Sequence, residues 1–158
     1  GMAPFLSFTA EEAWKVFDGG PTIFTQTTWP LPTPEAGLLQ RWQDIRTVRE
    51  AVNKAIEAVR TEGGVGSSLQ AEVCVGAPPE TLDLLQSLGE DLKFGLITSQ
   101  AQGVPADSLT VTVTPSAHAK CARCWHWRAD VGADAQHPLL CGRCVSNLHG
   151  AGETRTVA

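Results

Sequence analysis

Two Cys-x-x-Cys pairs near the carboxyl end constrain this 158-residue chain more than any other feature of its sequence. They are Cys121 with Cys124 and Cys141 with Cys144, separated by 16 residues. Two residues between paired cysteines let both thiolates reach one ion from a tight turn, and the longer return brings the second turn to the opposite side of a tetrahedron. The spacing therefore predicts one structural zinc ion held by four thiolates, with no open position at which the metal could activate water.

The cysteine-rich segment needs such an ion because it offers few aliphatic side chains. A segment of about 40 residues rarely folds on a core this small without a disulfide or a bound metal. Zinc binding contributes on the order of 10 kcal/mol to the folding free energy of comparable fingers. The amino end has no secretory pattern, which favours a metal over disulfides, although disulfides or another metal are the alternatives. His126, His137 and His149 are predicted not to be ligands, since four cysteines already complete the coordination sphere.

Aromatic and cationic side chains gather beside these cysteines. Tryptophan and arginine stack on bases, and arginine pairs with phosphate. From residue 119 onward the chain carries five basic and three acidic side chains, against seven basic and 14 acidic ones before. This asymmetry indicates a polyanionic partner. The alternative for the tryptophans is that they shield the thiolates as a miniature core. The side chains concerned are Trp125, Trp127, Arg123, Arg128 and Arg143.

The amino-terminal third predicts helices. Residues 7–17 (SFTAEEAWKVF) read as a short helix, for which Thr9 and Glu12 would form a capping box. Residues 18–37 contain four prolines and three glycines, which predicts a loop with one short extended piece, Thr22 to Thr28.

The clearest helix lies between Glu35 and Glu62, where apolar residues recur at steps of three and four until Gly63-Gly64. A polar group falls beside that apolar stripe, within about 60° on the helix. It is either a solvated flank or a surface that faces RNA phosphates. Its members are Arg46, Arg49, Asn53 and Arg60.

The middle of the chain predicts a small mixed unit. The pattern indicates strands at 69–75, 92–100 and 107–115 and a helix of about ten residues that starts at the Pro78-Pro79 pair. Cys74 is expected to fill the core rather than to react.

These elements predict an α+β fold in three parts: residues 1–62 with N-terminal helices, one of them long; residues 63–117, a small mixed α/β unit; and residues 118–158, a zinc-ribbon-like four-cysteine finger. No segment approaches 18 uninterrupted apolar residues, so no membrane partner is expected. The abrupt apolar start after Gly1-Met2 predicts a piece of something larger.

Three stretches resemble the C-terminal region of bacterial isoleucyl-tRNA synthetase, a class I aminoacyl-tRNA synthetase. "KCARCWHWRADVG…HPLLCGRCVSNLHGAGETR" resembles its terminal finger, and "APFLSFTAEEAW" resembles the end of its helical anticodon-binding domain. "VREAVNKAIEAVRTEGGVGSSLQAEV" resembles the helix and strand that join them. Gly63-Gly64 departs from the more charged turn expected there, which affects only local loop contacts.

The resemblance implies a parent enzyme that activates isoleucine with ATP and loads it onto tRNA in the cytoplasm. This chain has neither a His-Ile-Gly-His nor a Lys-Met-Ser-Lys-Ser signature, so no catalytic residue is predicted in it. Its expected role is recognition of the anticodon arm of isoleucine tRNA, with the rest of the synthetase chain as its other partner and no DNA.

Carried over by position, the resemblance makes Arg123 and Trp125 candidates for anticodon contacts, and Arg128 and Arg143 candidates for phosphate contacts. Two other functions compete. A related finger ends the formamidopyrimidine-type DNA glycosylases, but these need an N-terminal catalytic proline and a helix-two-turn-helix segment that the sequence does not show, since Pro4 is not terminal. The other is a zinc-stabilised protein-interaction module.

Overall fold

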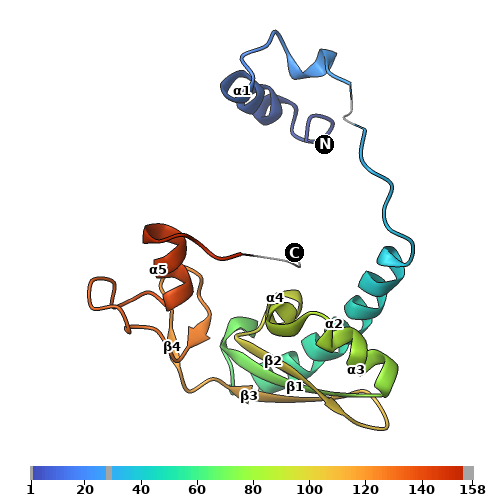
Figure 1. Cartoon of the computed structure of the whole chain (residues 1–158), viewed down its shortest axis with the longest axis vertical. Helices are drawn as coiled ribbons and strands as arrows, with labels where there is room; N and C mark the ends of the chain where they lie inside the picture. Colours follow the sequence, from blue (N-terminus) through green and yellow to red (C-terminus); the bar gives the residue numbers. More distant parts are fainter. Residues whose placement is uncertain (1, 28–29, 155–158) are drawn as a thin grey trace. The chain divides into compact units, whose positions relative to one another are not determined.

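The computed structural model describes residues 2–27 and 30–154, and the chain divides into two compact units, Gly1–Glu35 and Ala36–Ala158 (Figure 1). Among the described residues, no helix is both long enough and apolar enough to cross a membrane. The predicted α+β class is confirmed: helices accompany a three-stranded and a two-stranded sheet.

The first unit contains α1 (Ser7–Phe17) and the short 3₁₀ helix η1 (Ile23–Thr25). The Glu11 carboxylate joins them, because it accepts hydrogen bonds from the Thr22 hydroxyl at 2.8 Å and from the Ile23 N–H at 3.0 Å. The predicted helix is confirmed, but its capping box is wrong. The helix begins two residues before Thr9, and no side chain caps it.

The predicted extended piece at 22–28 is also wrong for the residues that the structure describes. Thr22 caps η1 through a hydrogen bond from the Phe24 N–H to its hydroxyl, so the chain turns there instead of extending. Residue 28 lies outside the described residues.

The second unit is built on a mixed sheet of order β2-β1-β3. Its central strand is β1 (Ala71–Ala77), which pairs in parallel with β2 (Gln100–Pro105) and antiparallel with β3 (Thr110–Pro115). Alternate residues of β1 face the core, which three helices complete: α2 (Leu38–Thr61), α3 (Pro79–Gln86) and α4 (Leu92–Leu96). We call these strands and helices the sheet unit.

The long helix α2 follows its prediction closely. Ile45, Val48, Val52 and Ile56 are buried at steps of three and four. The helix ends where Gly63 adopts φ +79°, a left-handed conformation that suits glycine. Short 3₁₀ turns, η2 (Ser68–Gln70) and η3 (Gly89–Asp91), lead into β1 and α4.

Two predictions for this unit are wrong. Residues 92–100 are not one strand, because Leu92 and Leu96 lie one helical turn apart and both reach the core, so α4 forms and the strand starts only at Gln100. A short apolar run does not separate a strand from a helix. Cys74 is half-buried and does not belong to the core, since it lies on the opposite face of β1 from Val73 and Val75.

Residues 118–154 form a small lobe, which we call the finger. It contains β4 (Ala119–Lys120), β5 (Trp127–Arg128), which pairs antiparallel with β4, and α5 (Gly142–His149). The finger belongs to the same compact unit as the sheet and α2. The three-part division at residues 62/63 and 117/118 stays a prediction about functional segments.

Candidate metal centre and the side chains around it

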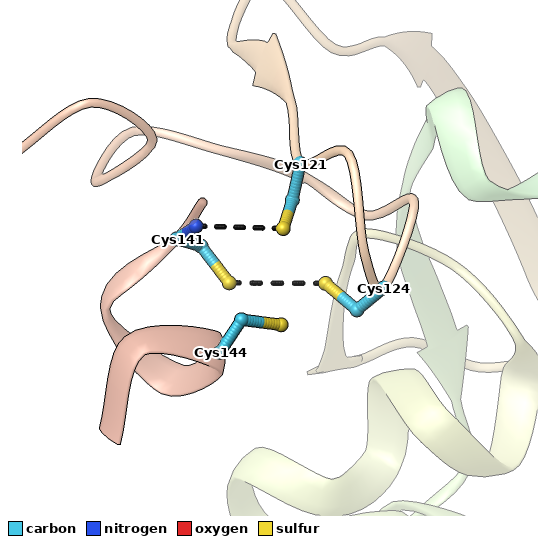
Figure 2. A group of neighbouring side chains, drawn as sticks. All are labelled: Cys121, Cys124, Cys141 and Cys144. Atoms are coloured by element: carbon cyan, nitrogen blue, oxygen red, sulfur yellow. Dashed lines mark hydrogen bonds between the residues drawn. The ribbon is translucent and has the colours of Figure 1, made fainter. Parts of the chain in front are cut away.

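Four cysteine sulfurs converge on one point of the finger (Figure 2). The sulfurs of Cys121, Cys124, Cys141 and Cys144 all lie within 4.8 Å of one another, and the Cys124 and Cys141 sulfurs are 3.7 Å apart. Zinc–sulfur bonds of about 2.3 Å in a tetrahedron imply sulfurs about 3.8 Å apart, so the group fits one zinc ion. A disulfide needs about 2.05 Å, and all five cysteines are free.

Local structure on each side of the group aims the sulfurs inward. The Trp125 N–H donates to the Cys121 carbonyl at 3.0 Å, which closes the first Cys-x-x-Cys turn. Cys141 is the N-cap of α5, and Cys144 lies in its first turn. The amino end of a helix favours negative charge, so it favours both thiolates. The Cys141 N–H also points at the Cys121 sulfur, 3.4 Å away.

The thiols differ in how readily they ionise. Burial opposes ionisation of Cys121, but hydrogen bonds from the Cys124, Cys141 and Arg123 backbone outweigh it and lower the pKa of the thiol to about 6. At Cys124, burial is the largest cause that raises the pKa to about 12, and neighbouring thiols add to it. Burial likewise raises the pKa of Cys141. Several thiolates this close repel one another, and a divalent cation relieves that repulsion.

The three histidines that follow the first cysteine pair, His126, His137 and His149, lie outside this group in the described part of the chain. The His126 Nδ1 atom is 3.1 Å from the Cys124 carbonyl oxygen, and its ring meets Phe94 edge-on. His137 and His149 stack on each other, with ring centroids 4.0 Å apart. These placements agree with a ligand set made of cysteines.

Each arginine predicted to face RNA from the finger has a partner within it. The Arg123 Nη1 atom lies 3.6 Å from the Cys144 sulfur. Arg128 pairs with Asp130 at 2.9 Å, and Arg143 holds the Glu153 carboxylate with two hydrogen bonds of 2.6 and 2.7 Å. These arginines therefore brace the finger, and a phosphate that met Arg128 or Arg143 would share it with a carboxylate.

Trp125 is placed differently from all of them. Its side chain is 60% exposed, and its backbone adopts φ +65°, a conformation that costs a residue with a Cβ about 1–2 kcal/mol. The Lys120 ammonium lies 5.6 Å from the centre of its ring. Sequence reasoning did not single out Lys120, because only the pairing of β4 with β5 brings it to the tryptophan.

Trp127 is half-buried, and its backbone joins the finger to the sheet unit. It lies opposite Lys120 in the two-stranded sheet, and its backbone N–H donates to the Ser99 hydroxyl at 2.6 Å. The two tryptophans thus differ in exposure: Trp127 is half-buried, and Trp125 is exposed.

The polar group on α2 occupies its predicted helix. Arg46, Asn53 and Arg60 are exposed, Arg49 is half-buried, and Arg60 pairs with Glu57 at 3.3 Å.

Comparison with known proteins agrees with this arrangement. Residues 1–75 match the family described as the anticodon-binding domain of tRNA ligase. Residues 120–147 match the zinc finger found in FPG and IleRS. The finger family alone would leave a glycosylase open, but the match over the first 75 residues does not. The chain is thus similar to a tRNA-ligase segment that carries both an anticodon-binding domain and a zinc finger.

Named relatives are similar to this chain over nearly its whole length. The chain is 57% identical to the isoleucine–tRNA ligase of Cupriavidus metallidurans over 99% of its own length, and 54% identical to that of Ralstonia pickettii over the same share. It is 57% identical to that of Paraburkholderia xenovorans. The chain is thus similar to a segment of these isoleucine–tRNA ligases, and the predicted resemblance is confirmed. It spans 17% of the length of these relatives.

Proposed function

We propose that this chain is the C-terminal tRNA-binding region of an isoleucine–tRNA ligase and contacts the anticodon arm of isoleucine tRNA. The full-length enzyme would ligate isoleucine to tRNA with ATP in the cytoplasm, and the rest of its chain would be this region's second partner. The region itself binds and orients RNA. Support comes from the two matched families, which join anticodon-binding and zinc-finger segments in one chain.

The observation that carries the proposal is the exposed ring of Trp125. A side chain held at positive φ with 60% of its surface in water does little for folding. An unstacked base of an RNA loop can stack on such a ring. The Lys120 ammonium beside it supplies a cation for the adjoining phosphate.

The other predicted contacts keep their roles within the proposal. Arg123 flanks Trp125 on the base side, while Arg128 and Arg143 approach the phosphates. The exposed polar face of α2 forms a second contact with the arm. The zinc ion, held by the four thiolates, keeps the Cys121–Cys124 turn rigid, so that Trp125 is presented in one orientation. The polar face of α2 that makes the second contact consists of Arg46, Arg49, Asn53 and Arg60.

Binding titrations with isoleucine tRNA, an unrelated tRNA and duplex DNA, each at two salt concentrations, test the function. Binding to phosphate weakens as salt rises, and only recognition of the cognate tRNA separates the three ligands. We expect Trp125→Ala to weaken cognate binding about tenfold, the size of one lost stacking contact. The control is Leu139→Ala, which removes another exposed apolar side chain of the finger.

Three results would contradict the proposal. Equal affinity for all three ligands would leave only non-specific charge attraction. Full affinity in Trp125→Ala together with a lower melting temperature would make the tryptophan a shield of the thiolates. A chain that binds no nucleic acid at all would favour the protein-interaction module.

A further inference from the structure

A cleft of about 500 Å³ lies where the finger meets the sheet unit, a volume within the range of small-ligand sites. Neither the metal centre nor Trp125 lines it. One wall is formed by β5 and the turn that follows, from Trp127 to Asp130. The other wall comes from the sheet unit, where Lys93, Ser99 and Gln100 face the cleft.

Contacts on both sides fix the walls of this cleft. The buried Ser99 hydroxyl accepts a hydrogen bond from the Trp127 backbone N–H at 2.6 Å and donates to the Leu69 carbonyl. These two bonds join β5 of the finger to the segments just before β2 and β1. The Phe94 ring of α4 meets His126 edge-on, with centroids 5.4 Å apart. The Arg143 guanidinium of α5 lies 4.8 Å from the centre of the same ring. The cleft is therefore preformed, and is not a gap between two loosely tethered modules.

The rim of the cleft carries two pairs of opposite charge and a histidine beside a carboxylate. Lys93 pairs with Glu90 at 2.8 Å, Arg128 with Asp130 at 2.9 Å, and the His118 ring lies 3.9 Å from the Glu72 carboxylate. Donors and acceptors thus alternate around a site with little net charge, and the exposed amide of Gln100 adds one of each.

Such a rim suits neither a polyanion nor an apolar ligand. A polyanion would need unpaired cations, and an apolar ligand would leave these polar groups without water. A flat heteroaromatic ring with donors and acceptors on its edge fits, because it can stack on the Trp127 side and hydrogen-bond to the rim. A nucleobase has this chemistry.

A row of neighbouring side chains connects the exposed tryptophan with the wall of the cleft. Lys120 lies directly across from Trp127 in the β4–β5 ladder, and its ammonium approaches the Trp125 ring. Cross-strand partners place their side chains on the same face. Trp125, Lys120 and Trp127 therefore lead in that order toward the cleft.

We propose that this cleft receives a second unpaired nucleotide of the bound tRNA, with its base on the Trp127 side and its edge hydrogen-bonded by Gln100 and Glu72. The inference rests on the proposed function, because both nucleotides belong to the strand that stacks on Trp125. It adds a base-reading subsite shared by the finger and the sheet unit.

Filling the cleft tests this subsite directly. Ala129 is an exposed residue that lines it, so Ala129→Trp blocks the cleft while every described side-chain hydrogen bond is kept. Ala133→Trp is the matched control, since Ala133 is exposed in the same loop and does not line the cleft. With zinc content equal in all variants, we expect Ala129→Trp to weaken cognate tRNA binding about tenfold and Ala133→Trp to change it less than twofold.

Abasic RNA then shows whether a base is read. The probe is an anticodon stem-loop RNA in which one loop nucleotide at a time lacks its base but keeps its phosphate. At one position the loss should weaken binding to the original chain about tenfold and have no further effect on Ala129→Trp. If Ala129→Trp weakens every probe by the same factor, the cleft reads no base and the inference is wrong.

The two proposals fail separately. If Ala129→Trp binds tRNA as the original chain does while Trp125→Ala binds less tightly, the cleft is not a subsite but the proposed function stands. If the original chain shows no preference for its tRNA, the proposed function fails and the subsite fails with it.

Discussion

The sheet unit and the finger belong to one compact body but are stabilised in different ways. Thirteen buried apolar side chains form the core of the sheet unit, whereas the fully buried core of the finger consists of three cysteines. A fold of the first kind depends on shape and area removed from water. The second kind depends on a cation that neutralises its sulfur ligands. One body can therefore lose the structure of its finger through a change of chemistry alone.

Loss of one thiolate should have the largest effect. Cys141→Ser removes a ligand, and since zinc contributes on the order of 10 kcal/mol to small fingers, the finger should unfold while the sheet unit keeps its core. Two-dimensional NMR of the chain measures both outcomes in one spectrum. Cys74→Ser is the matched control, because Cys74 is half-buried on the outer face of β1 and lies outside the sulfur group. Simultaneous unfolding of both parts would show that the comparison is wrong.

A cavity in the aliphatic core should have the next largest effect. Leu85 is fully buried, and Leu85→Ala should lower the free energy of unfolding of the sheet unit by about 2–5 kcal/mol. Chemical denaturation followed by far-UV circular dichroism measures the loss. Zinc stoichiometry in the absence of denaturant should stay at one per chain, because no ligand has changed. A chain that lost its zinc with this substitution would show that the sheet unit holds the finger together.

Relief of backbone strain should stabilise the finger slightly. Trp125→Gly removes the Cβ that makes φ +65° unfavourable. The free energy of unfolding of the zinc-bound chain should therefore stay the same or rise by up to about 1 kcal/mol, and its melting temperature should not fall. Trp125→Ala keeps the Cβ and serves as the comparison. A marked fall in the melting temperature of Trp125→Gly would mean that the ring shields the thiolates after all.

The sequence predicted those parts of this body that short-range patterns determine. The cysteine spacing predicted the sulfur group, and the apolar period of residues 38–61 predicted α2 and its stop at Gly63. The helix period and each Cys-x-x-Cys turn are local signals, and the 16-residue return between the turns needs only the ion at which the four sulfurs meet. The α+β class followed from the same patterns.

The parts that long-range pairing determines could not be predicted. Lys120 meets Trp125 only because β4 pairs with β5, and no local pattern specifies this register. Ser99 holds the finger through a partner 28 residues away. Residues 92–100 were misassigned because the burial of Leu92 and Leu96 depends on the sheet against which they pack. The cleft between the two parts was invisible in the sequence for the same reason.

The smallest expected effect concerns the ion pair of Glu90 and Lys93 at the edge of the sheet unit. Glu90 pairs with Lys93, whose side chain is only 11% exposed, and the Lys93 ammonium lowers the pKa of the Glu90 carboxyl below its ordinary value of 4.5. A lowered pKa in the folded state stabilises the fold above the unfolded value, and this stabilisation is lost as pH falls through the folded pKa. Since Glu90 is 87% exposed, it amounts to less than about 1 kcal/mol. The free energy of urea unfolding should therefore differ between the original chain and Glu90→Gln at pH 6 and converge once the pH falls below the lowered pKa of Glu90. Zinc is chelated beforehand in both variants, so that loss of zinc on thiol protonation cannot contribute. A difference between the two variants that persists in acid would assign the effect to packing instead of charge.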